Sequence, residues 1–209
     1  MGQGWAADPG VAMERARELA DRAVSLDPTD ARGLAIAGHV RAFNRHSIDE
    51  ALALHERAID LNPNLPLAWT LAGLAFCYAG QHELAVRRIE QARKLSPFDP
   101  HGSFHDAALS VPLLLLGRNA EALEASRRAA TMNPTLSTSY KGYLAALGQL
   151  SQGKNGAAFL TDLAAVHCHL SRLEPNFTLA TARARSPLRR EQDVNLYIEG
   201  LRKAGLRDS

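Results

Sequence analysis

The sequence of 209 residues is poor in the residue types that usually carry chemistry or cross membranes. Its two cysteines, Cys77 and Cys168, lie in separate apolar helical contexts, which predicts free buried thiols and suits a reducing compartment. The formal net charge is +2, too small to indicate a nucleic acid or a membrane surface as a partner. The longest apolar run, around Val111 to Leu116, is far shorter than the roughly 20 residues of a membrane-spanning helix.

Motifs of catalysis, cofactor binding and targeting are missing from the sequence as well. There is no glycine-rich phosphate loop, no paired-cysteine motif and no carboxylate dyad. The opening MGQGWAADPG lacks the basic and apolar regions of a secretory signal, and Ala6 stands where myristoylation needs Ser or Thr. We therefore expect a soluble cytoplasmic protein with no cofactor, no metal, no nucleic-acid or membrane partner, and no enzymatic activity of its own.

What the sequence does contain is a pattern of small and apolar residues that repeats. The clearest unit runs from Pro66 to Pro97 and predicts two amphipathic helices joined by a short turn. Gly73 and Ala85 would let the two helices approach closely, while Trp69 and Phe76 would fill the space beside that contact. The pattern is that of the tetratricopeptide repeat, matched at Trp69, Ala72-Gly73, Phe76, Ala85, Ile89, Ala92 and Pro97.

The same register recurs along the chain. The prolines that close the second helices are Pro28, Pro63, Pro97, Pro134 and Pro175, with spacings of 35, 34, 37 and 41 residues. The sequence therefore predicts an all-α, right-handed tetratricopeptide superhelix, an α-solenoid of antiparallel helix pairs. We expect repeats at about 31–63, 66–97, 103–134 and 137–175. A half-repeat helix would occupy residues 1–30, and a linker with a capping helix residues 176–209.

The first of these segments is incomplete by the standard of the others. Ala16 and Ala23 precede Pro28 by the same intervals at which Ala85 and Ala92 precede Pro97. Residues 11–27 are thus predicted to be the second helix of a repeat whose first helix is missing. Two explanations remain open: the chain is the tail of a longer protein, or its first repeat is atypical.

Local signals predict further details of the repeats. His55 replaces the large apolar residue that the template expects, and Ser47 with Glu50 forms a predicted capping box. Pro112 should kink the first helix of the third repeat. The second helix of the last repeat, at about 155–173, is expected to be longer than its counterparts. The predicted capping helix has one apolar face, formed by Val194, Tyr197, Ile198 and Leu201.

A binding groove is expected along the first helices of the repeats, because arrays of this kind bind extended or helical segments there. By template position its lining residues are His39, Phe43, Thr70, Leu74, Cys77, Tyr78, Ala107 and Val111. The lining lacks the Lys and Asn residues that clamp a terminal carboxylate, which disfavours a chaperone-adaptor role. Either a protein or peptide segment binds here, or the groove is filled by the chain's own C-terminal segment or by a sister subunit.

Four other clusters of potentially reactive or basic residues have simpler explanations. His101 and His105 have a metal-like spacing, but His101 precedes the expected helix. In the run His167-Cys168-His169, adjacent helical positions point in different directions, and Cys77 with His82 lacks an orienting acid. The arginines at 183, 185, 189 and 190 lack an aromatic platform for nucleic acid and are followed by acidic residues. Packing and intrachain ion pairs are the expected roles.

Three stretches together resemble a more specific group of proteins. They are LNPNLPLAW, LSPFDPHGSF and the ending LEPNFTLATARARSPLRREQDVNLYIEGLRKAGL. They resemble the C-terminal tetratricopeptide region of bacterial multidomain signalling proteins. In those proteins similar repeats follow a class III adenylate/guanylate cyclase domain or an OmpR-type winged-helix DNA-binding domain. The resemblance implies a non-catalytic regulatory module, from a cyclase or alternatively from a transcriptional regulator.

Overall fold

A computed structural model describes residues 8–43, 47–152 and 156–208 of the chain. The opening residues 1–7, and residue 155 at the predicted start of the last second helix, lie outside the described residues. Within the described ranges every regular element is helical and no strand occurs, so the predicted all-α class is confirmed. None of the helices in these ranges combines the length and the apolarity that crossing a membrane requires.

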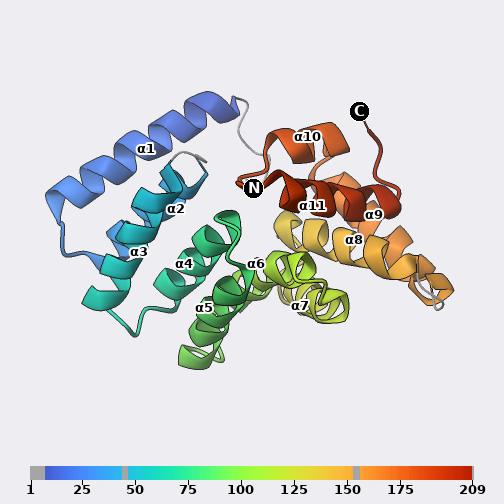
Figure 1. The fold of residues 1–209 in the computed structure, drawn as a ribbon, viewed down its shortest axis with the longest axis horizontal. Helices are drawn as coiled ribbons and strands as arrows, with labels where there is room; N and C mark the ends of the chain where they lie inside the picture. Colours follow the sequence, from blue (N-terminus) through green and yellow to red (C-terminus); the bar gives the residue numbers. More distant parts are fainter. Residues whose placement is uncertain (1–7, 44–46, 153–155, 209) are drawn as a thin grey trace. The chain divides into compact units, whose positions relative to one another are not determined.

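The chain divides into two compact units, each described by itself. The N-terminal unit comprises Gly4–Asp99 together with the short segment Pro187–Arg189. Its helices are α1 Pro9–Leu26, α2 Ala31–Ala42, α3 Ile48–Leu61, α4 Pro66–Tyr78 and α5 His82–Leu95. Figure 1 shows these helices following one another side by side from blue to green, and each packs against its successor.

The C-terminal unit comprises residues 100–186 and 190–209. Its elements are α6 Gly102–Leu115, α7 Asn119–Met132, α8 Ser137–Ser151, the 3-10 turn η2 Gly156–Phe159, α9 Leu160–Leu173, α10 Leu179–Ala184 and α11 Glu191–Lys203. Helix α8 packs against α6, α7, α9 and α11, so it is the core element of this unit. The division of the chain into four repeats, a half-repeat and a cap stays a prediction.

The second helix of every pair ends two residues before a proline. Helices α1, α3, α5, α7 and α9 all stop there, and the intervening C-cap residue has an extended φ between −139° and −144°. The residue before a proline is driven out of the helical region by the proline ring, and here the helix has already ended at that point. The closing prolines read from the sequence therefore mark the helix ends correctly.

Two of the first helices end instead at a glycine. Gly80 after α4 and Gly117 after α6 have φ values of 86° and 73°, a left-handed conformation that side chains with a Cβ rarely adopt. The amide of Gln81 donates to the carbonyl of Phe76, and that of Arg118 to the carbonyl of Leu113. These bonds satisfy carbonyls that a helix end otherwise leaves unpaired. The turn within each pair is thereby fixed by one glycine.

Close contact between paired helices depends on small residues, as the sequence predicts. A Cβ placed on Gly73 of α4 would lie 2.5 Å from Cγ1 of Ile89 and 3.0 Å from the carbonyl oxygen of Ala85. Ala85 and Ile89 are fully buried. In the preceding pair, Gly38 stands in the same way against His55. The helix axes can approach this closely only because neither glycine carries a side chain.

Helix α11 crosses α8 in a similar manner in the C-terminal unit. A Cβ on Gly148 would collide with the carbonyl oxygen of Gly200, and a Cβ on Gly200 would lie 2.7 Å from the carbonyl oxygen of Ala145. The predicted apolar face of α11 is confirmed, since Val194, Tyr197, Ile198 and Leu201 are each at most 2% exposed. This face is the hydrophobic contribution of α11 to the unit.

Four details of the sequence interpretation need correction or addition. Ser47 occupies the N-cap of α3, but its side chain makes no capping hydrogen bond. Helix α9 has 14 residues, as α3, α5 and α7 have, because the preceding residues form η2 instead. Cys168 is a free thiol but is exposed, since α9 buries only its Val166 and Leu170 face. Helix α10 was not expected.

Candidate functional site

Three of the predicted groove residues meet in the N-terminal unit. The rings of His39 and Phe43 lie edge to face with centroids 5.0 Å apart, and Phe43 lies 6.1 Å from the ring of Tyr78. His39 and Phe43 come from the end of α2, and Tyr78 is the last residue of α4. Helices α2 and α4 are the first helices of two consecutive predicted repeats, and their C-terminal ends meet here. We call these three residues the aromatic cluster.

The other predicted groove residues are buried in this structure. Thr70 and Cys77 are 0% exposed and Leu74 is 8% exposed, all on α4. Ala107 and Val111 lie on α6 in the C-terminal unit and are 1% and 7% exposed. A ligand could touch these side chains only after a rearrangement. Tyr78 of the aromatic cluster is itself only 3% exposed, so His39 and Phe43, which are half-buried, are the predicted lining residues that a ligand could reach directly.

The segment Pro187–Arg189, which lies far along the chain, contacts the end of α4 at Tyr78. The amide of Arg189 donates a hydrogen bond of 2.9 Å to the carbonyl oxygen of Tyr78. The last carbonyls of a helix have no partner within the helix, so the end of α4 offers an acceptor to any neighbouring backbone. Leu188 is fully buried, and the guanidinium of Arg189 lies 3.9 Å from the carboxylate of Asp49 on α3. The segment Pro187–Arg189 is thus an integral part of the N-terminal unit.

A small cavity opens beside the aromatic cluster. Its volume is about 190 Å³, and it is lined by Met13, Glu14, Arg17, Val40, Arg41, Phe43 and Ser47. Arg41 forms ion pairs with Asp21 of α1 and with Glu50 of α3. Burial lowers the pKa of His39 to about 3, so its imidazole is neutral at physiological pH. The cavity therefore presents the ring of Phe43 and charged side chains of both signs, Glu14 with Arg17 and Arg41, rather than a titrating base.

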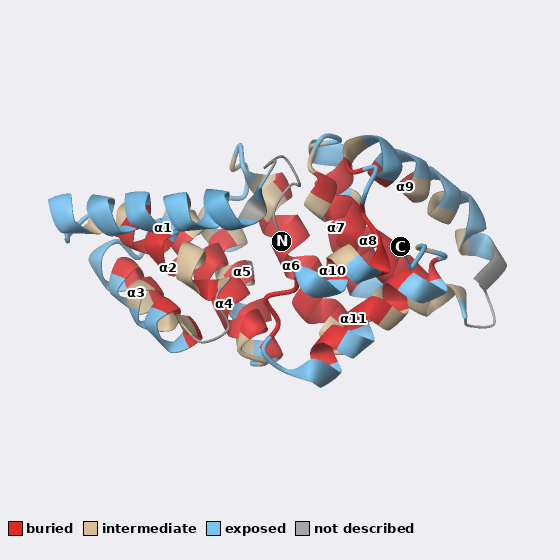
Figure 2. Ribbon diagram, turned by 90° about the horizontal axis from the view of Figure 1, so that it is seen from above, coloured by how far each residue is buried: buried red, intermediate tan, exposed pale blue. Residues whose placement is uncertain are grey.

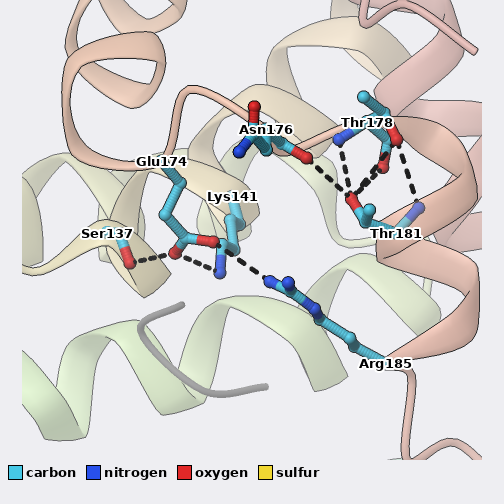
Figure 3. Close-up of polar contacts among 7 residues, drawn as sticks. All are labelled: Ser137, Lys141, Glu174, Asn176, Thr178, Thr181 and Arg185. Carbon is cyan, nitrogen blue, oxygen red and sulfur yellow. Dashed lines mark hydrogen bonds and ion pairs between the residues drawn. The ribbon is translucent and has the colours of Figure 1, made fainter. Parts of the chain in front are cut away.

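The C-terminal unit contains a separate polar cluster, shown in Figure 3. The carboxylate of Glu174 accepts a hydrogen bond from Ser137, pairs with Lys141 at 2.6 Å, and lies 3.6 Å from Arg185. Glu174 and Lys141 are 7% and 2% exposed. Nearby, Thr178 and Thr181 form a capping box at the start of α10. These contacts join α8, the loop after α9, and α10, which is a structural role.

The histidines with metal-like spacing do not converge. His101 lies before the first residue of α6, as expected, and His105 is buried within that helix. His167 is hydrogen-bonded to the carbonyl of Ala204, while His169 packs against the ring of Tyr140. Across the described ranges, no three His, Cys, Asp or Glu side chains gather in a way that could hold a metal ion.

The basic cluster near the C-terminus is paired within the chain, as the sequence interpretation expected. Arg183 pairs with Glu191 at 2.6 Å, and Arg190 pairs with Asp193 at 2.8 Å. Arg185 and Arg189 have the longer contacts to Glu174 and Asp49 described above. Each of the four guanidinium groups therefore faces a carboxylate.

Comparison with known proteins finds curated relatives that match over part of their length. No family model matches the chain. Over 118 residues the chain is 30% identical to small glutamine-rich tetratricopeptide repeat-containing protein 2 of Mycosarcoma maydis. The match covers 56% of this chain and 33% of that protein. The chain thus spans about a third of the length of this relative.

Several solved structures share the fold at low sequence identity. YrrB, described as a TPR protein with an unusual peptide-binding site, matches with a TM-score of 0.55 and 15% identity over 88% of this chain and 91% of YrrB. PilF of Pseudomonas aeruginosa gives 0.59 and 14%, over 89% and 81%. MamA gives 0.53 and 14%, over 79% and 85%. At such identities the likeness shows the fold alone, and that fold is the tetratricopeptide solenoid.

Proposed function

We propose that this chain is a non-catalytic tetratricopeptide module that binds an extended protein segment at the C-terminal ends of α2 and α4. The observation that carries the proposal is the hydrogen bond from the Arg189 amide to the Tyr78 carbonyl. It means that the surface already holds a non-helical segment, supplied by the chain itself. YrrB, a protein of the same fold, is described as having an unusual peptide-binding site. A peptide-binding role for this chain agrees with that description.

The contacts of the bound segment indicate what a partner would present. Leu188 is an apolar residue that is removed from solvent, and the amide of the following residue satisfies the end of α4. The basic side chain of Arg189 then faces Asp49, a pair too exposed to add more than about 1 kcal/mol. We therefore propose that the partner offers a leucine-like residue in a non-helical backbone, followed by a basic residue.

The chain's own segment would act as a built-in competitor for this partner. A tethered segment binds with an effective concentration on the order of millimolar when the tether spans the distance well. A free peptide of equal intrinsic affinity must exceed that concentration to displace it. Binding of a partner is thus expected to be weak in the parent chain and stronger when the segment is disabled.

This expectation can be tested with a labelled peptide of residues 184–192, ARSPLRREQ. Its affinity would be measured by fluorescence anisotropy for the parent chain and for the variant Leu188→Asp. The aspartate removes the apolar anchor of the internal segment, so we expect tighter binding of the free peptide to the variant. Arg189→Ala is the matched control, because it keeps the backbone donor and loses only an exposed ion pair.

Two outcomes would contradict the proposal. One is equal affinity of the peptide for the parent chain and for Leu188→Asp at concentrations up to the millimolar range. The other is a parent chain that is dimeric in solution by light scattering, with the dimer dissociated by Leu188→Asp. That result would make a second copy of the chain the partner, which is the alternative of self-association.

The finer proposal concerns the protein to which the module belongs. We propose a cytoplasmic bacterial signalling protein in which the module regulates an attached class III cyclase domain; a winged-helix DNA-binding domain is the alternative. The support is the LSPFDPHGSF joint and the GLRKAGL ending in the sequence. Reading the coding sequence upstream of this chain distinguishes the two. A cyclase domain predicts that the Leu188→Asp change alters cyclic-nucleotide synthesis in the whole protein, whereas any other upstream domain would refute the cyclase proposal.

A further inference from the structure

The segment Pro187–Arg189 is the tip of a short loop, residues 186–190, that connects α10 to α11. The tip is part of the N-terminal unit, whereas the residues on either side of it belong to the C-terminal unit. Figure 2 shows the segment between α10 and α11 coloured as buried before it becomes exposed at the start of α11. We call residues 186–190 the latch loop, because its tip occupies the surface proposed above for a partner.

One arginine of α10 bridges the two ends of the latch loop. The guanidinium of Arg183, in the last turn of α10, donates to Oε1 of Glu191 and to Oδ1 of Asn195, each at 2.6 Å. Both acceptors lie on α11. The two bonds come from different nitrogens of one planar group, so they fix the direction of α10 relative to α11 as well as the separation of the two helices. Arg183 thus closes the latch loop at its base.

The backbone of the latch loop is restrained at both ends as well. The amide of Ser186 donates to the carbonyl oxygen of Arg183 at 3.2 Å, and that of Asp193 to the carbonyl oxygen of Arg190 at 3.1 Å. The guanidinium of Arg190 binds both carboxylate oxygens of Asp193, at 2.8 and 2.9 Å. Pro187 fixes its own φ and restricts the residue before it. The loop therefore loses little conformational entropy when its tip is seated.

We propose that Arg183 is a positioning residue for the partner surface, and that it acts by holding the latch loop in the shape that seats its tip. This inference rests on the proposed function, because the same surface at the ends of α2 and α4 would receive the partner. Within the described residues, the side-chain contacts of Arg183 go to Glu191 and Asn195 rather than to the tip. The bridge to α11 raises the effective concentration of the tip at the surface.

The strength of the bridge sets how strongly the latch loop competes with a partner. The side chains of Arg183 and Glu191 are 44% and 66% exposed, and an exposed ion pair changes an equilibrium constant by a factor of about five at most. Loss of the bridge should therefore raise the affinity of the surface for a partner by about threefold to fivefold. The coupling is reciprocal, so a partner that displaces the tip should weaken the bridge by the same factor.

The first measurement follows the tip without any partner. The amide of Arg189 donates to the carbonyl oxygen of Tyr78 at 2.9 Å, so its hydrogen exchange, measured by NMR, reports how often the tip leaves the surface. We expect Arg183→Ala to speed up this exchange by about threefold to fivefold. Arg202→Ala is the matched control, because it removes an exposed ion pair with Glu199 that lies within α11. It should leave the exchange of Arg189 unchanged.

The second measurement separates positioning of the tip from a general loss of stability. The labelled peptide ARSPLRREQ, residues 184–192, is titrated with the 209-residue chain by fluorescence anisotropy. Arg183→Ala should bind the peptide about threefold to fivefold more tightly than the parent does. In the Leu188→Asp background the tip is already disabled, so adding Arg183→Ala should not change the affinity further. Arg183→Lys keeps a cation beside Glu191 and should lie between the parent and Arg183→Ala in both measurements.

The proposal is overturned if the Arg189 amide of Arg183→Ala exchanges at the parent's rate. It is also overturned if Arg183→Ala changes the peptide affinity equally in the parent and in the Leu188→Asp background, because Arg183 would then act on something other than the tip. A peptide that binds none of these variants refutes the proposed function. The exchange of Arg189 still decides the role of Arg183 in that case: acceleration in Arg183→Ala supports it, and an unchanged rate overturns it.

Discussion

The ammonium group of Lys141 lies 2.6 Å from the carboxylate of Glu174, with side chains only 3% and 5% exposed. Burial lowers the pKa of Lys141, while the ion pair with Glu174 opposes that effect. Lys141 also lies 4.7 Å above the ring of Phe177. The two charges come from α8 and from the residue that follows α9, so the pair ties the end of one helix to the side of another.

Removing one charge of this pair should be costly. Glu174→Gln leaves the ammonium of Lys141 buried without a counter-ion, and breaking a buried pair in this way costs about 3–5 kcal/mol. The measurement is hydrogen exchange of the α8 amides, which should become faster. In the control Glu191→Gln, which removes the exposed partner of Arg183, the change should be below about 1 kcal/mol. Equal protection in Glu174→Gln and the parent would show that the pair does not stabilise the unit.

The contact between α4 and α5 gives a second prediction. Gly73→Leu places a large side chain where even a Cβ meets Ile89 at 2.5 Å. The helices must separate or distort, at a cost of about 1–3 kcal/mol or more. We expect a clear fall in melting temperature, followed by circular dichroism. Arg87→Leu, at an exposed position on α5, adds a leucine without this clash and should melt as the parent does. An unchanged melting temperature for Gly73→Leu would refute the assigned register.

Features set by neighbouring residues could be predicted from the sequence. A closing proline forbids the helical conformation of the residue before it, and Gly73 is needed because Ala85 and Ile89 lie opposite. Each of these signals acts within one helix pair and recurs at a regular interval, so a single clear repeat sets the register for the rest. The buried face of α11 could also be predicted from the sequence, because its apolar residues recur with the helical period.

Contacts between distant parts of the chain could not be predicted in this way. Lys141 and Glu174 are two ordinary charged residues in the sequence, and only the fold brings them together. The seating of Leu188 in the N-terminal unit depends on a return of the chain after about 90 residues, for which periodicity gives no signal. The apolar neighbours of Cys168 predict a buried thiol, but Cys168 lies on the exposed side of α9.

The crossing of α8 and α11 gives a third prediction. Gly148→Ala introduces a methyl group that would collide with the carbonyl of Gly200, so α11 must move away from α8. Tyr197 and Leu201, both 0% exposed, would then become accessible, and the variant should bind the dye ANS and self-associate. Size-exclusion chromatography with ANS fluorescence measures both effects. The control Gly117→Asn changes a glycine with no atom within 4 Å of an added Cβ and should leave α11 in place. A Gly148→Ala variant without new ANS binding would contradict the crossing.

The last prediction concerns the stability of the N-terminal unit towards acid. His55 is 0% exposed and packs against Gly38 of α2. Neither of its ring nitrogens has a hydrogen-bond partner in the described part of the chain. Burial lowers the pKa of His55 from 6.5 to about 4. The unfolded chain therefore binds a proton between these values that the folded chain does not. The contribution of neutral His55 to the free energy of unfolding is fully present above about pH 6.5, and it is lost as the pH drops towards 4.

The size of this effect follows from the two pKa values. Between pH 7 and pH 5 the free energy of unfolding should fall by about 2 kcal/mol on account of His55 alone. Urea denaturation at the two pH values, followed by the fluorescence of Trp69 in a Trp5→Phe background, measures the unit that contains α4. His55→Leu should cut the loss by that amount, and the remaining loss is due to His39, whose pKa burial also lowers, to about 3. His169→Leu, at an exposed histidine of the other unit, should not change the loss. If His55→Leu and the parent lose stability equally, a proton on His55 does not oppose folding.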